Sequence, residues 1–168
     1  MNAEQSEFLK SRVSAAQYGQ RTYGVPASVT LAQAILESGW GKSDLAIQCN
    51  NDFGIKAGAQ ASPETYKEFP TTEFVNGVLR HVMAQFVRYP SLTLGFGAHA
   101  RLLAMAPRYK PAMTVRNSPV AFAFQLQHCG YSTNPQYGAT LAQLISEYDL
   151  TQYDLPPEPP AQEEKLAA

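Results

Sequence analysis

The dipeptide Asn76-Gly77 constrains the fold of this 168-residue chain more than any other feature of the sequence. Asn-Gly between two hydrophobic runs is the strongest short-range signal for a β-hairpin, with a type I′ turn at its tip. Residues 69–75 before it and 78–89 after it are rich in β-branched and aromatic side chains. The sequence therefore predicts a two-stranded hairpin within residues 65–89.

The rest of the body shows the spacing of amphipathic helices. Pro26 suits the first turn of a helix, and Gly39 and Gly41 are residues of the kind that end one. Ser118 and Pro119 mark another helix start, as N-cap and first helical residue. The predicted helices cover residues 4–18, 26–37, 92–105, 119–128 and 135–148. Two helices, a hairpin and three further helices make an α+β fold that is mostly helical.

Length and composition indicate one domain followed by a tail. Hydrophobic residues make up 45% of the chain and charged residues 16%, which excludes a wholly disordered protein. Four prolines fall between positions 156 and 160, and such a run holds neither a helix nor a strand ladder. We expect a domain over residues 1–153 and an extended Pro/Glu-rich tail over 154–168, whose end resembles an expression-vector remnant.

Charge and hydropathy exclude several classes of protein. The net charge is −1; the tail carries −3, so the body carries +2. Neither value indicates the basic patch of a nucleic-acid-binding protein. The apolar runs are too short to span a bilayer, and the charged residues among the first ten positions exclude a secretory signal peptide. We expect no nucleic-acid partner, no membrane insertion and a monomeric chain.

The histidines argue against a metal centre. His81, His99 and His128 lie far apart in the sequence and do not form a metal-ligand motif. We predict a structural or surface role for all three, and neither a metal nor another cofactor.

One carboxylate lies where catalysis would use it. Glu37 is placed at the last turn of an apolar helix, directly before Gly39-Trp40-Gly41. Apolar neighbours and the negative end of the helix dipole both raise the pKa of such a carboxyl. A carboxyl that stays protonated near neutral pH is suited to act as a general acid. Taken alone, a glutamate near a helix end is more often a solvated surface residue.

Five motifs, one of which contains Glu37, occur in an order and spacing that are typical of one enzyme family. They are Glu37-Ser-Gly-Trp-Gly-Lys-Ser, Asn50-Asn-Asp-Phe-Gly-Ile-Lys, Thr71-Thr-Glu-Phe, Phe86-Val-Arg-Tyr-Pro-Ser and Gly130-Tyr-Ser-Thr-Asn-Pro-Gln-Tyr. In this order and spacing the set resembles glycoside hydrolase family 73, the endo-β-N-acetylglucosaminidases that cleave peptidoglycan. The resemblance extends over roughly residues 6–148, nearly the whole body.

The resemblance implies a lysozyme-like fold, with a helical lobe and a small β-hairpin lobe that close over a sugar-binding cleft. It implies that Glu37 is the general acid, Glu73 the second carboxylate and Tyr131 a tyrosine near the reaction centre. Each has a simpler alternative. For Glu73 the alternative is a cross-strand charge on a solvated hairpin face, and for Tyr131 it is a packing tyrosine.

Further residues are expected to bind the sugar. Trp40, the only tryptophan, is predicted to stack on sugar rings as a cleft wall, with core packing as its alternative. Phe53, Tyr109 and Tyr137 are weaker candidates of the same kind. Asn51 is predicted to bind an acetamido group or to cap its own loop.

Two departures from the family pattern carry their own predictions. Asp52 stands where relatives usually have an apolar residue, and it adds an acid near the expected cleft. Cys49 and Cys129 directly precede two cleft motifs, and if both motifs line one cleft the thiols lie close enough to form a disulfide.

The residues and the resemblance together predict a peptidoglycan hydrolase that cleaves the β-1,4 bond between N-acetylglucosamine and N-acetylmuramic acid. Inverting, retaining and substrate-assisted routes stay open. Without a signal peptide, we expect delivery to the periplasm or cell wall by phage lysis, by a secretion system or within a larger exported protein. A secreted antibacterial effector would have a cognate immunity protein as partner. The alternatives are a muramidase or lytic transglycosylase of the same fold, and a glycan-binding module without activity.

Overall fold

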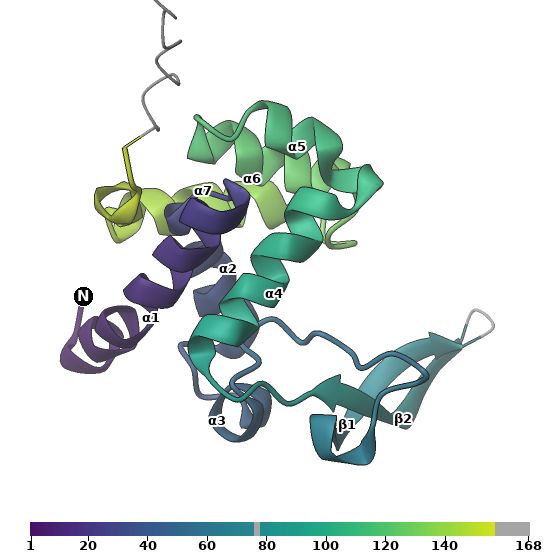
Figure 1. Ribbon diagram of the computed structural model, residues 1–168. Coiled ribbons are helices and arrows are strands. Elements are labelled where there is room, and N and C mark those ends of the chain that lie inside the picture. The colour runs from purple at the N-terminus through teal and green to yellow at the C-terminus, as the bar shows by residue number, and fades with distance from the viewer. Residues whose placement is uncertain (76–77, 157–168) are drawn as a thin grey trace, which may run out of the picture.

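The computed structural model describes residues 1–75 and 78–156, with the backbone alone at 73–75. Over these residues the chain forms seven α-helices, three 3-10 turns and one hairpin (Figure 1). The helices are α1 (Ala3–Tyr23), α2 (Ala27–Ser38), α3 (Asp44–Cys49), α4 (Leu92–Met105), α5 (Lys110–Thr114), α6 (Pro119–His128) and α7 (Tyr137–Glu147). The 3-10 turns are η1 (Pro63–Thr65), η2 (Pro107–Tyr109) and η3 (Leu150–Tyr153). The strands are β1 (Tyr66–Val75) and β2 (Val78–Val87).

Helix α2 is the centre of the helical lobe. All its residues from Ala27 to Ile35 are buried, and α1, α6, α7 and η3 pack around it. A helix that is surrounded in this way needs apolar or small side chains on every face. It ends at Gly39, and Gly39, Trp40 and Gly41 all have left-handed backbone conformations, with φ of 57°, 61° and 72°. This tight turn fixes the last helical turn, which carries Glu37.

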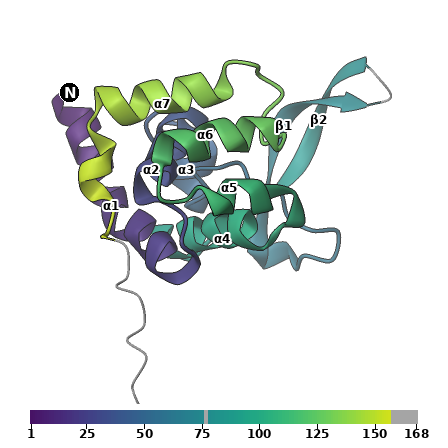
Figure 2. The same cartoon turned by 90° about the horizontal axis from the view of Figure 1, so that it is seen from above.

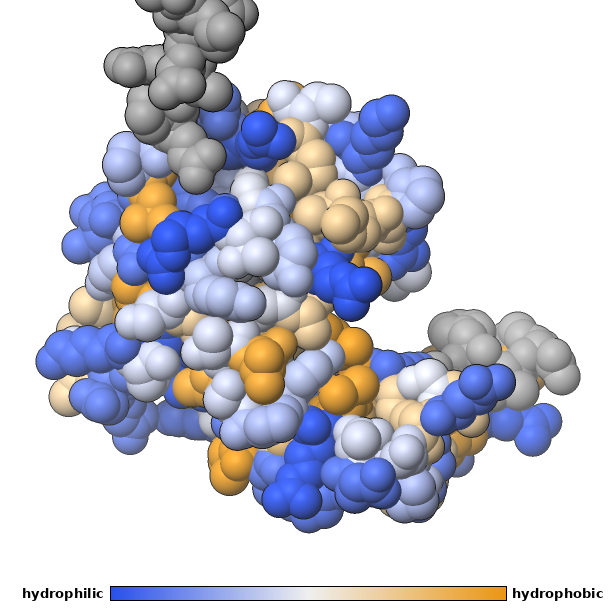
Figure 3. All heavy atoms as spheres, viewed as in Figure 1, coloured by the Kyte–Doolittle hydropathy of each residue, from blue (hydrophilic) through white to orange (hydrophobic). Residues whose placement is uncertain are grey.

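The hairpin projects from one side of the helical lobe (Figures 1 and 2). Strands β1 and β2 are antiparallel, and Val75 pairs with Val78, so two residues connect them. The segment before η1 runs along the end of β2: Lys56 bridges to Phe86, and the Val87 amide donates to the Ile55 carbonyl at 2.9 Å. A hollow opens between the hairpin and the upper helices (Figure 3).

The predicted class is confirmed, as are the hairpin and the helices at 92–105 and 119–128. The predicted type I′ turn at Asn76-Gly77 lies outside the described residues. Helix α1 runs five residues beyond its predicted end, to the left-handed cap at Gly24. Helices α3 and α5 were not predicted, since six and five residues are too short to show a period.

The last helix begins later than the Asn-Pro signal predicts. The Asn134 side chain accepts a hydrogen bond from the Gln136 amide at 2.9 Å, and the Asn134 carbonyl accepts from the Tyr137 amide at 3.1 Å. Residues 134–136 therefore form a turn, and α7 starts at Tyr137.

The domain also extends past its predicted end at residue 153. The Asp154 carboxylate accepts from the Ser28 amide at 2.8 Å and from the Ser28 hydroxyl at 2.7 Å, in the first turn of α2. The Leu155 amide donates to the side chain of Gln20 at 2.9 Å. Asp154 and Leu155 thus belong to the folded body. None of the helices within residues 1–75 and 78–156 has the length and apolar character to span a membrane.

Candidate active site

Glu37 lies at the end of α2 and lines a cleft on the hairpin side of the helical lobe. The hydroxyl of Tyr137 donates a hydrogen bond to Oε1 of Glu37 over 2.9 Å. Burial raises the pKa of Glu37, and this effect outweighs the lowering of its pKa by the Tyr137 hydrogen bond. The direction agrees with the sequence prediction, and it suits a proton donor.

Two stacked tyrosines stand behind Glu37. The rings of Tyr131 and Tyr137 lie 5.4 Å apart between centroids, at 19° between their planes. Tyr137 begins α7, and Tyr131 follows the turn at Gly130, whose φ is 72°. Burial, together with the charge of Glu37, raises the pKa of both phenols well above the usual tyrosine value. Both therefore stay neutral and keep a hydroxyl hydrogen to donate.

Two buried polar side chains hold these tyrosines, and neither was predicted as a site residue. Gln33, one helical turn before Glu37, donates from Nε2 to the Tyr137 hydroxyl at 2.9 Å. His99 of α4 lies 3.2 Å from the Tyr131 hydroxyl through Nε2. Burial lowers the pKa of His99 to about 3, so its imidazole is neutral. The signal for Gln33 is its place four residues before Glu37, which puts both side chains on the same face of α2.

The cleft has a volume of about 480 Å³ and a mixed lining. Aromatic and apolar side chains form part of its wall, and two cations, Lys56 and Arg108, accompany them. The Arg108 guanidinium lies 4.4 Å from the centre of the Tyr109 ring and also donates to its hydroxyl. The lining residues are Glu37, Phe53, Gly54, Ile55, Lys56, Leu102, Arg108, Tyr109, Tyr131 and Ser132.

The structure thus brings several predicted residues together. Glu37, Phe53, Tyr109 and Tyr131 all line this cleft, and Tyr137 contacts Glu37 directly. Glu73 lies in β1 opposite Arg80, but its side chain is outside the described residues. Its role as second carboxylate therefore stays a prediction.

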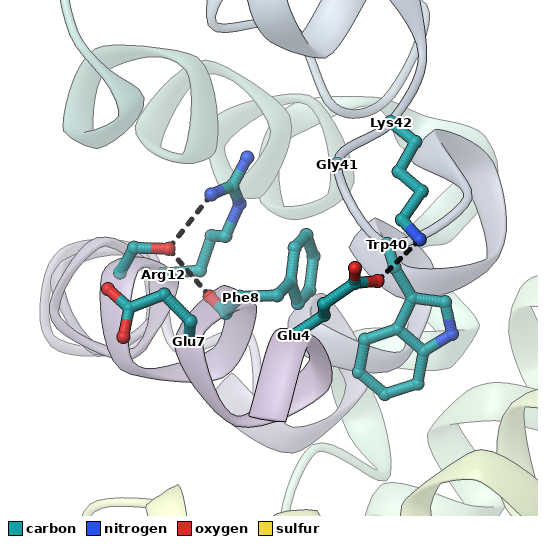
Figure 4. A pocket seen from close by; sticks show the side chains of 8 residues that line it. Glu4, Glu7, Phe8, Arg12, Trp40, Gly41 and Lys42 are labelled. Atoms are coloured by element: carbon teal, nitrogen blue, oxygen red, sulfur yellow. Dashed lines mark hydrogen bonds and ion pairs between the residues drawn. The ribbon is translucent and has the colours of Figure 1, made fainter. Parts of the chain in front are cut away.

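Trp40 is not a wall of this cleft, contrary to the prediction. Its indole packs edge-on against Phe8, with centroids 5.5 Å apart, and against Tyr148 at 4.8 Å. It lines a separate hollow on α1, beside the ion pair between Glu4 and Lys42 (Figure 4). The left-handed backbone of Trp40 turns its side chain away from Glu37 and toward α1.

Asn51 caps its own loop, the second of its two predicted roles. Its side chain is 1% exposed, and its amide donates to the carbonyls of Ile55 and Val87, each at 2.9 Å. Its Oδ1 accepts from the Ile55 amide. These bonds join α3 to the hairpin lobe and leave little of the amide for a ligand.

Asp52 is a structural acid. It is 1% exposed and forms an ion pair with Arg12 of α1, with Nε and Oδ2 3.0 Å apart. It does not line the cleft that contains Glu37.

The predicted Cys49–Cys129 disulfide is wrong, because both cysteines are free thiols. Cys49 ends α3, where its carbonyl accepts from the Tyr89 amide at 2.8 Å. Cys129 caps the C-terminus of α6. Helices α3 and α6 lie at opposite ends of the helical lobe (Figure 1).

Comparison with known proteins connects this geometry to a family. A family model described as mannosyl-glycoprotein endo-beta-N-acetylglucosaminidase matches residues 13–150. The exo-glucosaminidase LytG of Bacillus subtilis is 35% identical over 156 residues, which cover 90% of this chain and 54% of LytG. The peptidoglycan hydrolase FlgJ of Pseudomonas aeruginosa is 34% identical over 151 residues, which cover 88% of this chain and 38% of FlgJ. The chain thus spans about half of LytG and less of FlgJ.

A solved structure confirms the fold. The catalytic domain of the autolysin Auto from Listeria monocytogenes superposes with a TM-score of 0.80 and 31% identity. The match covers 92% of this chain and 89% of that domain. The expected lysozyme-like arrangement, a helical lobe with a small hairpin lobe, is therefore confirmed.

Proposed function

The chain belongs to the glucosaminidase family, glycoside hydrolase family 73, and from this premise we propose that it cleaves the glycan strand of peptidoglycan. The bond cut is the β-1,4 bond between N-acetylglucosamine and N-acetylmuramic acid. The observation that carries the proposal is Glu37, a carboxyl of raised pKa that opens onto a cleft and accepts a hydrogen bond from Tyr137.

Glu37 donates its proton to the glycosidic oxygen as the bond to the sugar carbon breaks. Its Oε1 accepts the Tyr137 hydroxyl, so Oε2 is the oxygen that carries the proton. Because burial raises its pKa, a larger fraction of Glu37 is protonated near neutral pH than of an ordinary glutamate. Because this hydrogen bond holds one carboxyl oxygen in place, the proton on the other oxygen has a fixed position for transfer to the substrate.

Glu73 supplies the second carboxylate from the hairpin. In an inverting enzyme it activates a water at a carboxyl separation of ~6.5–9.5 Å, and in a retaining enzyme it attacks the sugar at ~5–5.5 Å. In the substrate-assisted route it orients the acetamido group of the substrate. The anomer that is released first, followed by proton NMR, separates inversion from the other two routes.

The cleft lining supports an anionic glycan as substrate. The partly exposed side chains of Tyr131 and Leu102 offer apolar surface to sugar rings, whereas Tyr109 and Phe53 are buried. Lys56 and Arg108 place positive charge beside Glu37. Peptidoglycan carries carboxylates on its stem peptides, which match this charge. The relatives LytG and FlgJ, named as a glucosaminidase and a peptidoglycan hydrolase, agree with this substrate.

Mass spectrometry of the fragments released from purified peptidoglycan tests the proposal. The wild-type protein is expected to produce new reducing ends on N-acetylglucosamine. Glu37→Gln is expected to lose about a thousandfold in rate, because the amide matches the neutral carboxyl in size and charge but cannot donate a proton to the leaving oxygen. Glu64→Gln, at an exposed glutamate of η1, is the matched control and keeps full activity.

The same experiment separates the other candidate functions. Only Glu37 contributes a carboxyl to the cleft among the side chains that the structure describes, and a lytic transglycosylase needs just one. Reducing or anhydro ends on N-acetylmuramic acid would indicate a muramidase or transglycosylase. Absence of fragments from the wild-type protein would indicate a binding module.

The biological setting belongs to the proposal as well. We place the activity at the cell wall, in a phage lysis enzyme or a secreted antibacterial effector. An effector requires an immunity protein in the producing cell. Expression of the chain in the periplasm and in the cytoplasm of a test bacterium, with lysis as the readout, checks the place of action. Rescue by a neighbouring gene of the source genome distinguishes the effector from the phage enzyme.

A further inference from the structure

Buried polar atoms without a hydrogen-bond partner are concentrated behind the two tyrosines. Among the described residues there are three such side-chain atoms: Oε1 of Gln33, Nδ1 of His99 and Oδ1 of Asp52. Gln33 and His99 are fully buried, and each holds one of the stacked tyrosines. A buried unpaired polar atom costs free energy, and an apolar side chain of similar shape would avoid that cost. The unpaired oxygen of Gln33 thus carries a cost in stability, which directs attention to the hydrogen bond that its amide nitrogen makes.

The hydrogen bonds of Gln33 and Tyr137 run in one direction toward Glu37. Nε2 of Gln33 donates to the Tyr137 hydroxyl oxygen at 2.9 Å. The Tyr137 hydroxyl donates to Oε1 of Glu37, also at 2.9 Å. A phenol has one hydrogen, and the amide donor occupies a lone pair of its oxygen, so the hydrogen points toward Glu37.

We propose that Gln33 is a positioning residue of the general acid, which orients the Tyr137 hydroxyl toward Oε1 of Glu37 and so leaves Oε2 as the proton-donating atom. This inference rests on the proposed function. The amide also polarises the phenol, because successive hydrogen bonds strengthen one another. A stronger donor at Oε1 stabilises the carboxylate that forms when the proton leaves, which opposes the effect of burial.

A positioning residue and a residue that only fills space respond differently to replacement. If Gln33 only filled space, methionine, with a similar length and no unpaired oxygen, would be tolerated without effect on Glu37. If Gln33 acts through Tyr137, its removal weakens the donor to Glu37 and raises the pKa of that carboxyl further. Since the protonated form is the active one, the alkaline limb of the pH–rate profile then moves to higher pH.

The test compares Gln33→Met, Tyr137→Phe and the double variant. We expect Gln33→Met to move the alkaline limb of kcat/KM upward by about 0.5 pH unit and to lower kcat about tenfold, with thermal stability equal to or above that of the wild type. Tyr137→Phe is expected to shift the limb further, and Gln33→Met to add nothing in the Tyr137→Phe background. Gln143→Met, at an exposed glutamine of α7, is the control.

A profile unchanged by Gln33→Met overturns the proposal, and so does an equal shift in the Tyr137→Phe background. If Gln33→Met loses the fold, Gln33→Asn replaces it, since it keeps an amide that is too short to reach Tyr137. Titration of the carbon-13-labelled Glu37 carboxyl by NMR measures the same pKa shift without activity. An inactive wild-type protein therefore contradicts the proposed function and leaves the role of Gln33 testable by NMR.

Discussion

Two acids in this protein, Glu37 and Asp52, have a pKa set by the balance between desolvation and one polar partner. Glu37 is desolvated by the cleft wall and partly compensated by Tyr137. Asp52 follows the same rule with Arg12: burial raises the pKa of Asp52 more than the guanidinium lowers it. The two acids differ in access, since Glu37 opens onto the cleft and Asp52 is sealed between α1 and the loop after α3.

Replacement of Arg12 is expected to destabilise the protein in a pH-dependent way. Arg12→Met leaves Asp52 as an uncompensated buried charge, which costs about 3–5 kcal/mol of unfolding free energy near neutral pH. The pKa of Asp52 rises further without Arg12, so the folded state binds a proton more tightly than the unfolded state. Stability then falls as pH rises from the unfolded pKa of Asp52 through its folded pKa, and the loss is smaller in acid.

Urea denaturation of wild type and Arg12→Met at about pH 5 and about pH 7.5 measures this difference. The double variant Arg12→Met/Asp52→Asn serves as the control, since it removes the charge and is expected to recover part of the stability at the higher pH. An equal loss at both pH values would show that Arg12 stabilises the fold by packing on Phe8 alone, whose ring centre is 4.4 Å from its guanidinium.

At the scale of elements, the start of α4 packs tightly against the end of α3 and the segment that follows the hairpin. Asn50, the left-handed cap of α3, donates from its side chain to the Tyr89 carbonyl at 2.9 Å. The backbone of α4 passes so near that a Cβ at Gly95 would lie 2.3 Å from the Asn50 carbonyl oxygen. Gly95 therefore allows α3, the end of the hairpin and α4 to meet.

Gly95→Ala is expected to destabilise the protein by about 3 kcal/mol, because backbone at that distance cannot yield as a flexible side chain can. Helix propensity alone predicts the opposite sign, a gain of about 1 kcal/mol for alanine within a helix. Thermal denaturation decides between them. Gly58→Ala, at a loop glycine with open space around its Cβ position, is the control and is expected to leave the melting temperature nearly unchanged.

At the scale of the whole molecule, the cleft is made where the helical lobe meets the base of the hairpin. Glu37 and the tyrosines come from the helical lobe, whereas residues 53–56 approach the cleft from the connection to the hairpin. Asn51 fixes this connection through its bonds to Ile55 and Val87. The same arrangement separates the cysteines, which stay at different ends of the helical lobe.

Thiol titration with a chromogenic disulfide reagent checks this arrangement. We expect two thiols per chain in denaturant without reductant, and in the native protein a fast reaction at Cys129 alone, since Cys49 is buried and burial raises its pKa. Cys129→Ser is expected to abolish the fast phase. A chain with no titratable thiol in denaturant would contradict the separation of α3 and α6.

The sequence by itself determined the local features of this protein. The bounds of α4, the cap and first residue of α6, the hairpin and the position of Glu37 at a helix end all follow from signals within about four residues, such as caps, turn residues and periodicity. The five motifs indicate the family, and membership of that family implies the lysozyme-like fold. The later start of α7 is local as well, because the turn at Asn134 delays the helix by two residues.

Only the tertiary structure decided which side chains share a site. Tyr137 reaches Glu37 across 100 residues of sequence and His99 reaches Tyr131 across 32. The direction of Trp40, the internal use of Asn51 and the separation of the two cysteines depend on packing between elements, which no local pattern encodes. Hydrogen bonds and desolvation act over a few ångströms in space, irrespective of distance along the chain. For that reason the acid was visible in the sequence, whereas the residues that hold it in place were not.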